Sequence, residues 1–183
     1  MGSLKVRFEA VKSGWMTVRL ESPEQTLSFS PSYTPYDSIA ELINALYDFL
    51  SWSESETKSV VRWNEQPNEY EFVFVNAGEK AGLTISEISE RVSGRVREAV
   101  FSISDSHLQI ALPFWRALRD LQTNPFHNYE AEWRRQFPSR EMDALTDKVK
   151  VIQEIERRLA AYAQSPNEGI PWEELKAKLI NSK

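Results

Sequence analysis

The chain has 183 residues, of which 41% are hydrophobic and 27% are charged, and its formal net charge is −5. These proportions are typical of a folded globular protein and exclude a disordered chain. The absence of Cys excludes disulfides, thiol catalysis, iron–sulfur clusters and cysteine-based zinc sites. The acidic balance has the wrong sign for a protein dedicated to the phosphate backbone, so we expect no specific nucleic-acid binding.

The first 35 residues predict an antiparallel meander. Apolar and polar residues alternate over 4–10, 16–20 and 27–29, and Gly14 and Pro23 lie between these runs. Period-two alternation is typical of strands that bury one face and expose the other.

A helix is predicted over residues 38–52. Ser38 and Glu41 have the spacing of a capping box, in which the two side chains satisfy backbone donors of the first turn. Apolar residues then recur at helical spacing: Ile39, Leu42, Ile43, Leu46, Phe49 and Leu50. Such a helix would cover the apolar face of the sheet.

Strands are expected to resume after this helix. The apolar runs lie at 61–63, 70–74, 83–88 and 99–103, and a polar stretch over 89–98 separates the last two. In the second run Tyr70, Phe72 and Phe74 alternate with Glu69 and Glu71. The aromatic side chains should face the core and the carboxylates should face away from it.

A second covering helix is predicted over 106–122, with Ser106 and Gln109 as a second capping-box candidate. Pro113 leaves two interpretations open, because proline lacks the backbone donor of a helix interior. Either the helix is kinked there, or residues 107–111 form a strand and Pro113 begins the helix. We favour the kinked helix. Asn124 and Pro125 then end this region.

Beyond residue 125 the chain is predicted to be helical. Aromatic residues recur every four positions at Tyr129, Trp133 and Phe137, and a near-heptad apolar stripe runs over 139–162. We therefore predict an α+β fold, with an antiparallel sheet of about six strands and two covering helices in a domain at 1–125. Residues 126–183 form a helical C-terminal extension, either as a separate arm or packed on the same core.

Few residues are suited to catalysis or metal binding. No two glycines have the spacing of a P-loop or a dinucleotide-binding fingerprint, which excludes those nucleotide sites. His107 and His127 are the only histidines, and neither has a second ligand at helical spacing, so no metal and no cofactor are expected. Glu69 and Glu71 could act as an acid–base pair about 7 Å apart. We favour a solvated strand face instead.

The end of the chain resembles the tail of small bacterial addiction-module, antitoxin-like proteins. The resemblance lies in the helix at 154–162, which ends in Arg-Arg-Leu-Ala-Ala-Tyr, and in the later Gly-Ile-Pro-Trp-Glu-Glu-Leu segment at 169–175. It implies toxin binding by an exposed helical arm, with these contact or arm-shaping residues: Leu159, Tyr162, Pro171, Trp172 and Leu175. The alternative is that Trp172 and Leu175 dock the C-terminus on the protein's own core.

Residues 4–122 also look like the small α+β domains of bacterial immunity proteins, in architecture only. The leading hypothesis is a non-catalytic bacterial interaction protein, antitoxin- or immunity-like, that binds a protein partner or itself through its C-terminal helices. The alternatives are a small hydrolase that uses carboxylates and His107, and a module that binds a small ligand on the aromatic sheet. No apolar run approaches the ~20 residues of a membrane span, and the N-terminus lacks a signal-peptide pattern. We therefore expect a cytoplasmic protein without membrane contact.

Overall fold

The computed structural model describes residues 3–164 apart from 52, 54, 78–79 and 92–93. The described residues form an α+β fold that divides into two compact units, Met1–Val149 and Lys150–Lys183. The strands are β1 (Lys5–Lys12), β2 (Trp15–Glu21), β3 (Thr26–Phe29), β4 (Thr57–Glu65), β5 (Asn68–Ala77), β6 (Lys80–Arg91) and β7 (Gly94–Asp105). The helices are α1 (Ser38–Phe49), α2 (His107–Thr123), α3 (Tyr129–Trp133) and α4 (Ser139–Gln164).

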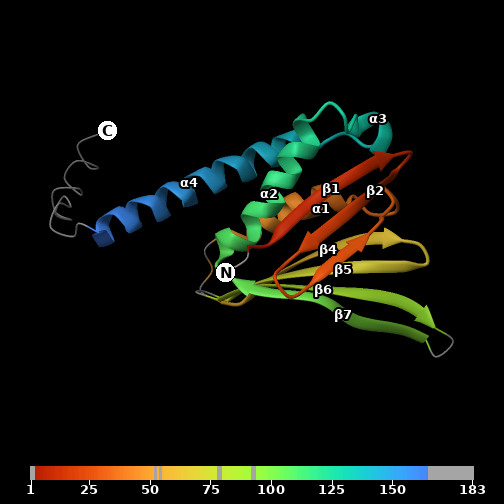
Figure 1. Ribbon diagram of the computed structural model, residues 1–183, viewed down its shortest axis with the longest axis horizontal. Coiled ribbons are helices and arrows are strands. Elements are labelled where there is room, and N and C mark those ends of the chain that lie inside the picture. Colours follow the sequence, from red (N-terminus) through yellow and green to blue (C-terminus); the bar gives the residue numbers. More distant parts are fainter. Residues whose placement is uncertain (1–2, 52, 54, 78–79, 92–93, 165–183) are drawn as a thin grey trace. The chain divides into compact units, whose positions relative to one another are not determined.

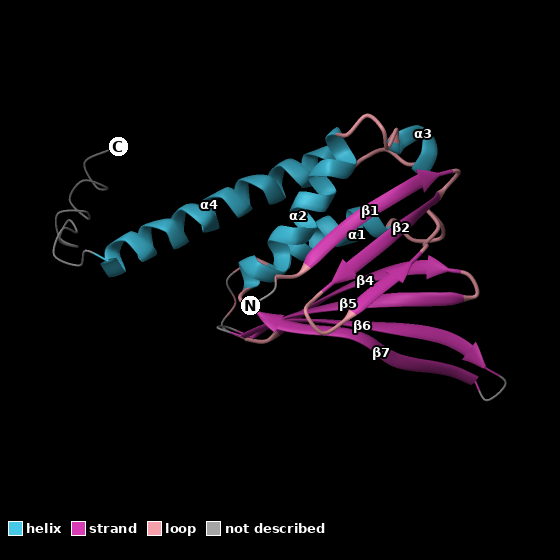
Figure 2. Ribbon diagram, in the orientation of Figure 1, coloured by secondary structure: helices cyan, strands magenta, loops and turns pink. Residues whose placement is uncertain are grey.

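The strands form two antiparallel sheets, which are visible in Figures 1 and 2. The orders are β1-β2-β3 and β4-β5-β6-β7, so the prediction of one sheet of about six strands is wrong. The two sheets are linked through Ser32, which forms isolated bridges to Trp15 and Asn64. Pro31 and Pro35 flank this link, and prolines prevent a continuous ladder because they lack the backbone donor.

The expected separation of strands by the polar stretch 89–98 is also wrong. Strands β6 and β7 remain paired out to Arg91 and Gly94, with one register shift between Ile85 and Ser86, so this stretch belongs to a long hairpin. Gly94 has a φ of +108°, a conformation that glycine adopts without steric cost. Most side chains of β7 from residue 94 to 99 are exposed, which explains why the apolar alternation that marks other strands is missing there.

An aromatic core joins the two sheets. Phe29 of β3 stacks on Tyr70 of β5 with ring centroids 4.2 Å apart, and Phe8 of β1 stacks on Trp63 of β4 at 6.1 Å. Helix α1 packs on β4 and β5, and helix α2 packs on β1 and β6. Phe114 of α2 completes the cluster against β5. Large rings of this kind contribute much of the burial that stabilises a domain of this size.

Helix α1 is capped one residue earlier than the sequence pattern predicts. Asp37, and not Ser38, caps α1 by accepting a hydrogen bond from the amide of Ala40. The Ser38 hydroxyl donates instead to the Arg62 carbonyl at 2.6 Å, and Glu41 accepts from the Arg62 amide at 3.1 Å. The predicted capping box therefore ties α1 to the edge strand β4.

Helix α2 confirms the helical interpretation of residues 107–111. Ser106 caps the helix by accepting from the amide of Gln109, as the sequence indicates. Pro113 lies inside this helix. The indole of Trp115 is half-buried and donates to the Thr146 hydroxyl at 3.0 Å, which joins α2 to the first half of α4.

Residues 126–149 pack on the strands of the first unit. The amide of Gly14, in the β1–β2 turn, donates to the Glu132 carbonyl at 2.6 Å, and the Ser13 amide donates to the Glu132 carboxylate at 2.7 Å. Trp133 of α3 is fully buried, as are the α4 residues Met142, Leu145 and Val149. Residues 126–149 therefore contact the β1–β2 turn and contribute buried side chains to the first unit.

The aromatic core gives a first prediction. Replacing Phe72 with Ala should lower the free energy of unfolding by about 3–5 kcal/mol, because it removes a fully buried ring and leaves a cavity. Denaturant unfolding followed by tryptophan fluorescence measures the effect. The control is Val73→Ala, whose half-buried side chain lies on the opposite face of β5. Equal losses for the two variants would contradict the assignment of the two faces.

The packing of residues 126–149 gives a second prediction. Trp133→Ala should destabilise the first unit by about 3–5 kcal/mol, because Trp133 is fully buried. Phe126→Ala is the matched control, since this aromatic side chain is 95% exposed and its loss should leave the unfolding midpoint unchanged. If Trp133→Ala also left the midpoint unchanged, the segment would be an arm and not part of the core.

Candidate functional site

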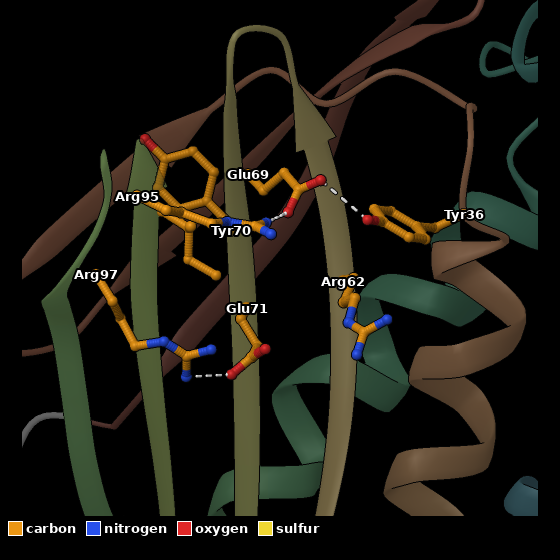
Figure 3. Close-up of a pocket in the computed structure, with 8 residues that line it drawn as sticks. Tyr36, Arg62, Glu69, Tyr70, Glu71, Arg95 and Arg97 are labelled. Carbon is orange, nitrogen blue, oxygen red and sulfur yellow. Dashed lines mark hydrogen bonds and ion pairs between the residues drawn. The ribbon is translucent and has the colours of Figure 1, made fainter. Parts of the chain in front are cut away.

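A hollow of about 390 Å³ lies over one end of the four-stranded sheet. It opens on the face turned away from the buried rings of Phe72 and Phe74. Its walls come from all four strands of this sheet and from the loop before α1: Tyr36, Arg62, Glu69, Tyr70, Glu71, Ile88, Arg95 and Arg97 (Figure 3). A hollow of this volume is within the range of small-molecule sites.

Strand alternation and register bring the charged residues together. In β5 the two glutamates alternate with the core-facing aromatic residues, so both carboxylates lie on the outer face. The register pairs Glu71 with Arg62 of β4, and pairs Glu69 with Ile88 of β6, which in turn pairs with Arg97 of β7. Residues far apart in the sequence thus form one patch.

Two arginines of β7 reach across β6 to the glutamates of β5. Arg95 pairs with Glu69 and Arg97 pairs with Glu71, across two strand spacings, or roughly 9–10 Å. The aliphatic parts of such side chains can cover apolar surface while the guanidinium stays at the rim. Ile88 and Ser86 lie between the strands and are buried. Glu71 itself is only 9% exposed, so this is not the freely solvated face that alternation alone indicates.

Tyr36 closes one side of the hollow. Its hydroxyl donates to Glu69 Oε1 at 2.9 Å, and this hydrogen bond, followed by burial, raises the pKa of Tyr36. The Arg62 guanidinium lies over the Tyr36 ring, 5.9 Å from its centroid, in a cation–π arrangement. Glu69 is therefore held from two sides, by Arg95 and by Tyr36.

Arg62 differs from the other two arginines. Its side chain is exposed, and among the described residues no carboxylate lies within ion-pair distance of it. Figure 3 shows its guanidinium on the same side of the sheet as Glu71, with no interaction drawn between them. Three guanidinium groups against two carboxylates give the hollow a net charge of +1 at neutral pH.

This arrangement is better suited to binding an anion than to acid–base catalysis. Each glutamate carboxylate is already engaged by an arginine guanidinium, and the arginines bring further N–H donors to the same patch. Within the described part of the chain, no group of three or more His, Cys, Asp or Glu residues could hold a metal ion.

The structure does not bring the histidines to this hollow. His107 packs against Phe49 with ring centroids 5.1 Å apart, and Phe49 contacts the core-facing Phe74. His127 lies near the end of α2, where its Nε2 is 3.0 Å from Asp120 Oδ2. The residues proposed for a hydrolase, His107 and the two glutamates, therefore lie on different faces of the sheet.

Of the predicted partner-binding residues, two lie in the described part of the chain. Leu159 and Tyr162 are exposed on α4, with exposed fractions of 63% and 59%. Val151 and Ile155 precede them at helical spacing and are also exposed. Pro171, Trp172 and Leu175 lie outside the described residues. Val151 was not singled out from the sequence, although its spacing of four from Ile155 could have identified it.

The sequence analysis identified Glu69 and Glu71 but not the other residues of the hollow. Arg95 and Arg97 lie two positions apart in the polar stretch, which is the one sequence signal that they share a strand face. Their partners depend on a register across β6, which no local pattern fixes.

No family model, curated protein or solved structure matches the chain. In the described residues, no helix has both the length and the apolar character that crossing a bilayer requires.

His107 gives a prediction on pH dependence. Burial lowers its pKa below the ordinary value of 6.5, so the unfolded chain binds a proton more readily than the folded chain does. The contribution of neutral His107 to the free energy of unfolding is therefore complete above the pKa that this histidine has in the unfolded chain. It is lost as the pH falls through 6.5 towards the lower pKa of His107 in the folded chain. Urea unfolding between about pH 7.5 and about pH 5.5 should show this decline.

His107→Gln should flatten this dependence, because glutamine does not titrate in this range. The control is His127→Gln, whose site beside Asp120 is at the end of α2. A decline of unchanged steepness in His107→Gln would mean that another group causes it.

Proposed function

We propose that the protein is a non-catalytic interaction protein that binds a protein partner through the second half of α4. The observation that carries this proposal is a stripe of exposed apolar side chains, each at least half exposed, which we call the α4 stripe: Val151, Ile155, Leu159 and Tyr162. Their spacing of four, four and three residues places them on one side of the helix.

The exposure of this stripe has a clear free-energy cost. Burial of one large apolar side chain is worth about 1.5–3 kcal/mol, and contiguous exposed apolar patches are unusual in monomeric proteins unless they bind something. In the first unit, by contrast, α4 buries Met142, Leu145 and Val149. A partner that covered the stripe would remove four such side chains from water.

The charged residues beside the stripe are neutralised within the helix. Glu154 accepts from Arg157 at 2.7 Å and from Arg158 at 2.6 Å. The hydrogen bond from Arg157, followed by that from Arg158, lowers the pKa of Glu154 to about 2. These exposed pairs contribute little to stability. They leave the helix with little net charge next to its apolar side, which favours an apolar groove or an amphipathic helix as the partner surface.

The resemblance of the tail to antitoxins supports a more specific proposal, in which the partner is a toxin-like protein that α4 neutralises. Leu159 and Tyr162 would then contact the partner, and Pro171, Trp172 and Leu175 would extend or shape the same arm. Self-association of two α4 helices is the competing outcome. The hydrolase alternative has less support, because His107 and the glutamates lie on different faces.

The test uses Leu159→Glu in the full chain, with Ala160→Glu as the matched control. Leu159 belongs to the stripe, whereas Ala160 lies on the far side of the same helix, about 145° from the mean stripe direction at 100° per residue. Both variants add one negative charge to an exposed helix position. Tagged proteins are used to capture partners, and sedimentation velocity measures self-association.

We expect Leu159→Glu to weaken the captured complex or the self-association at least tenfold, because it places a charge in an apolar contact. Ala160→Glu should bind as the original chain does. Equal weakening by both variants would assign the effect to charge and not to the stripe. A chain that is monomeric and captures nothing in all three forms would contradict the proposal.

A further inference from the structure

The hollow on the four-stranded sheet is separate from the α4 stripe and has a different chemistry. It carries a net positive charge in a chain whose formal net charge is −5. Its floor is the buried side chain of Ile88, and its rim is formed by guanidinium, carboxylate and phenol groups. Sites for small molecules commonly combine an apolar floor with a few fixed polar groups.

The backbone of Arg62 is held on both sides. Its amide donates to Glu41 and its carbonyl accepts from Ser38, both in the first turn of α1. The guanidinium lies over the Tyr36 ring, with its Cζ 5.9 Å from the ring centroid. An arginine whose backbone is already fixed beside such a ring loses less conformational entropy when it binds a ligand.

The donors of Arg62 remain available. A guanidinium has five N–H donors in a planar fork that matches carboxylate and phosphate oxygens. Among the described residues, no hydrogen bond or ion pair is formed by the guanidinium of Arg62. Arg95 and Arg97 also line the hollow, and each is engaged by one carboxylate.

The two glutamates position the arginines of β7. Without Glu69 and Glu71, the side chains of Arg95 and Arg97 would extend from an edge strand into solvent. The ion pairs draw both guanidinium groups over β6, towards Arg62 (Figure 3). The carboxylates also reduce the positive charge of the hollow, which keeps the affinity for any anion moderate.

We propose that this hollow binds the carboxylate or phosphate group of a small anionic ligand, with Arg62 as the principal binding residue. Arg97 and Arg95 contribute further donors, and the apolar part of the ligand lies on Ile88. This inference is independent of the α4 stripe, so either proposal can fail without the other.

The test is a titration of the full ¹⁵N-labelled chain, followed by the amide and arginine Nε–H resonances. Inorganic phosphate and acetate are the two probes, and chloride at matched ionic strength is the reference for screening. We expect saturable shifts at β4, β5 and β7 around the hollow. Saturation by phosphate alone would indicate a ligand with a phosphate group, and saturation by acetate alone would indicate a ligand with a carboxylate. Saturation by both would indicate a site that accepts either group.

Arg62→Gln should weaken this binding at least tenfold and leave the fold intact, because its side chain is exposed. Arg7→Gln is the matched control, since Arg7 is an exposed arginine of the other sheet, paired with Glu9, and should bind as the original chain does.

Three results would overturn the proposal. They are shifts that do not saturate, shifts that chloride reproduces, and unchanged binding in Arg62→Gln. A melting curve for each variant separates loss of the hollow from loss of the fold. Weaker binding in Arg7→Gln, equal to that in Arg62→Gln, would show a general charge effect and would count against the site.

Discussion

The two-residue period of strand β5 is the constraint on which both the core and the hollow depend. Tyr70, Phe72 and Phe74 project to one side, where they meet the rings of the other sheet and of α2. The same geometry forces Glu69 and Glu71 to the other side. A shift of one residue in the pairing register of β5 would bury both carboxylates where the aromatic rings now lie. The free-energy cost would be far above that of a substitution at the surface. The core therefore fixes the register that assembles the charged patch.

A second constraint joins residues 126–149 to the strands. Gly14 has a φ of +84°, and a Cβ there would lie 2.7 Å from the ring of Tyr33. Glycine permits this close approach and leaves its amide free to donate to Glu132. The guanidinium groups of Arg134 and Arg135 lie about 6 Å from the Tyr33 ring. The turn between β1 and β2 thus docks a segment more than a hundred residues away.

The sequence predicts local elements better than it predicts their assembly. The three N-terminal strands, α1 and α2 follow from apolar periodicity and from residues such as Ser106, and the structure has them. The division into two sheets lies at Ser32, where Pro31 and Pro35 limit the pairing to two isolated bridges, and apolar periodicity does not show which strands these bridges join. The outer end of the β6–β7 hairpin was not predicted, because most side chains of β7 from residue 94 to 99 are exposed and no apolar alternation marks the strand there. In the hollow, Glu69 and Glu71 were visible as a pair, but Arg62, Arg95 and Arg97 required a register across three strand pairings. On α4, helical spacing was sufficient to find Leu159 and Tyr162.

The charged residues of the hollow contribute little to the free energy of unfolding. Exposed ion pairs contribute about 0–1 kcal/mol each, and Arg95 and Arg97 are largely exposed. The Glu71 carboxylate is mostly buried, and the desolvation cost of such a group opposes the gain from its ion pair with Arg97. Arg62 adds a charge without a carboxylate partner among the described residues. The patch is thus close to neutral for stability, whereas the rings on the opposite face of the same strand account for the burial that stabilises the fold. The strand register holds this charged cluster in place although the cluster adds little to stability. Such an arrangement is expected of a preorganised binding surface.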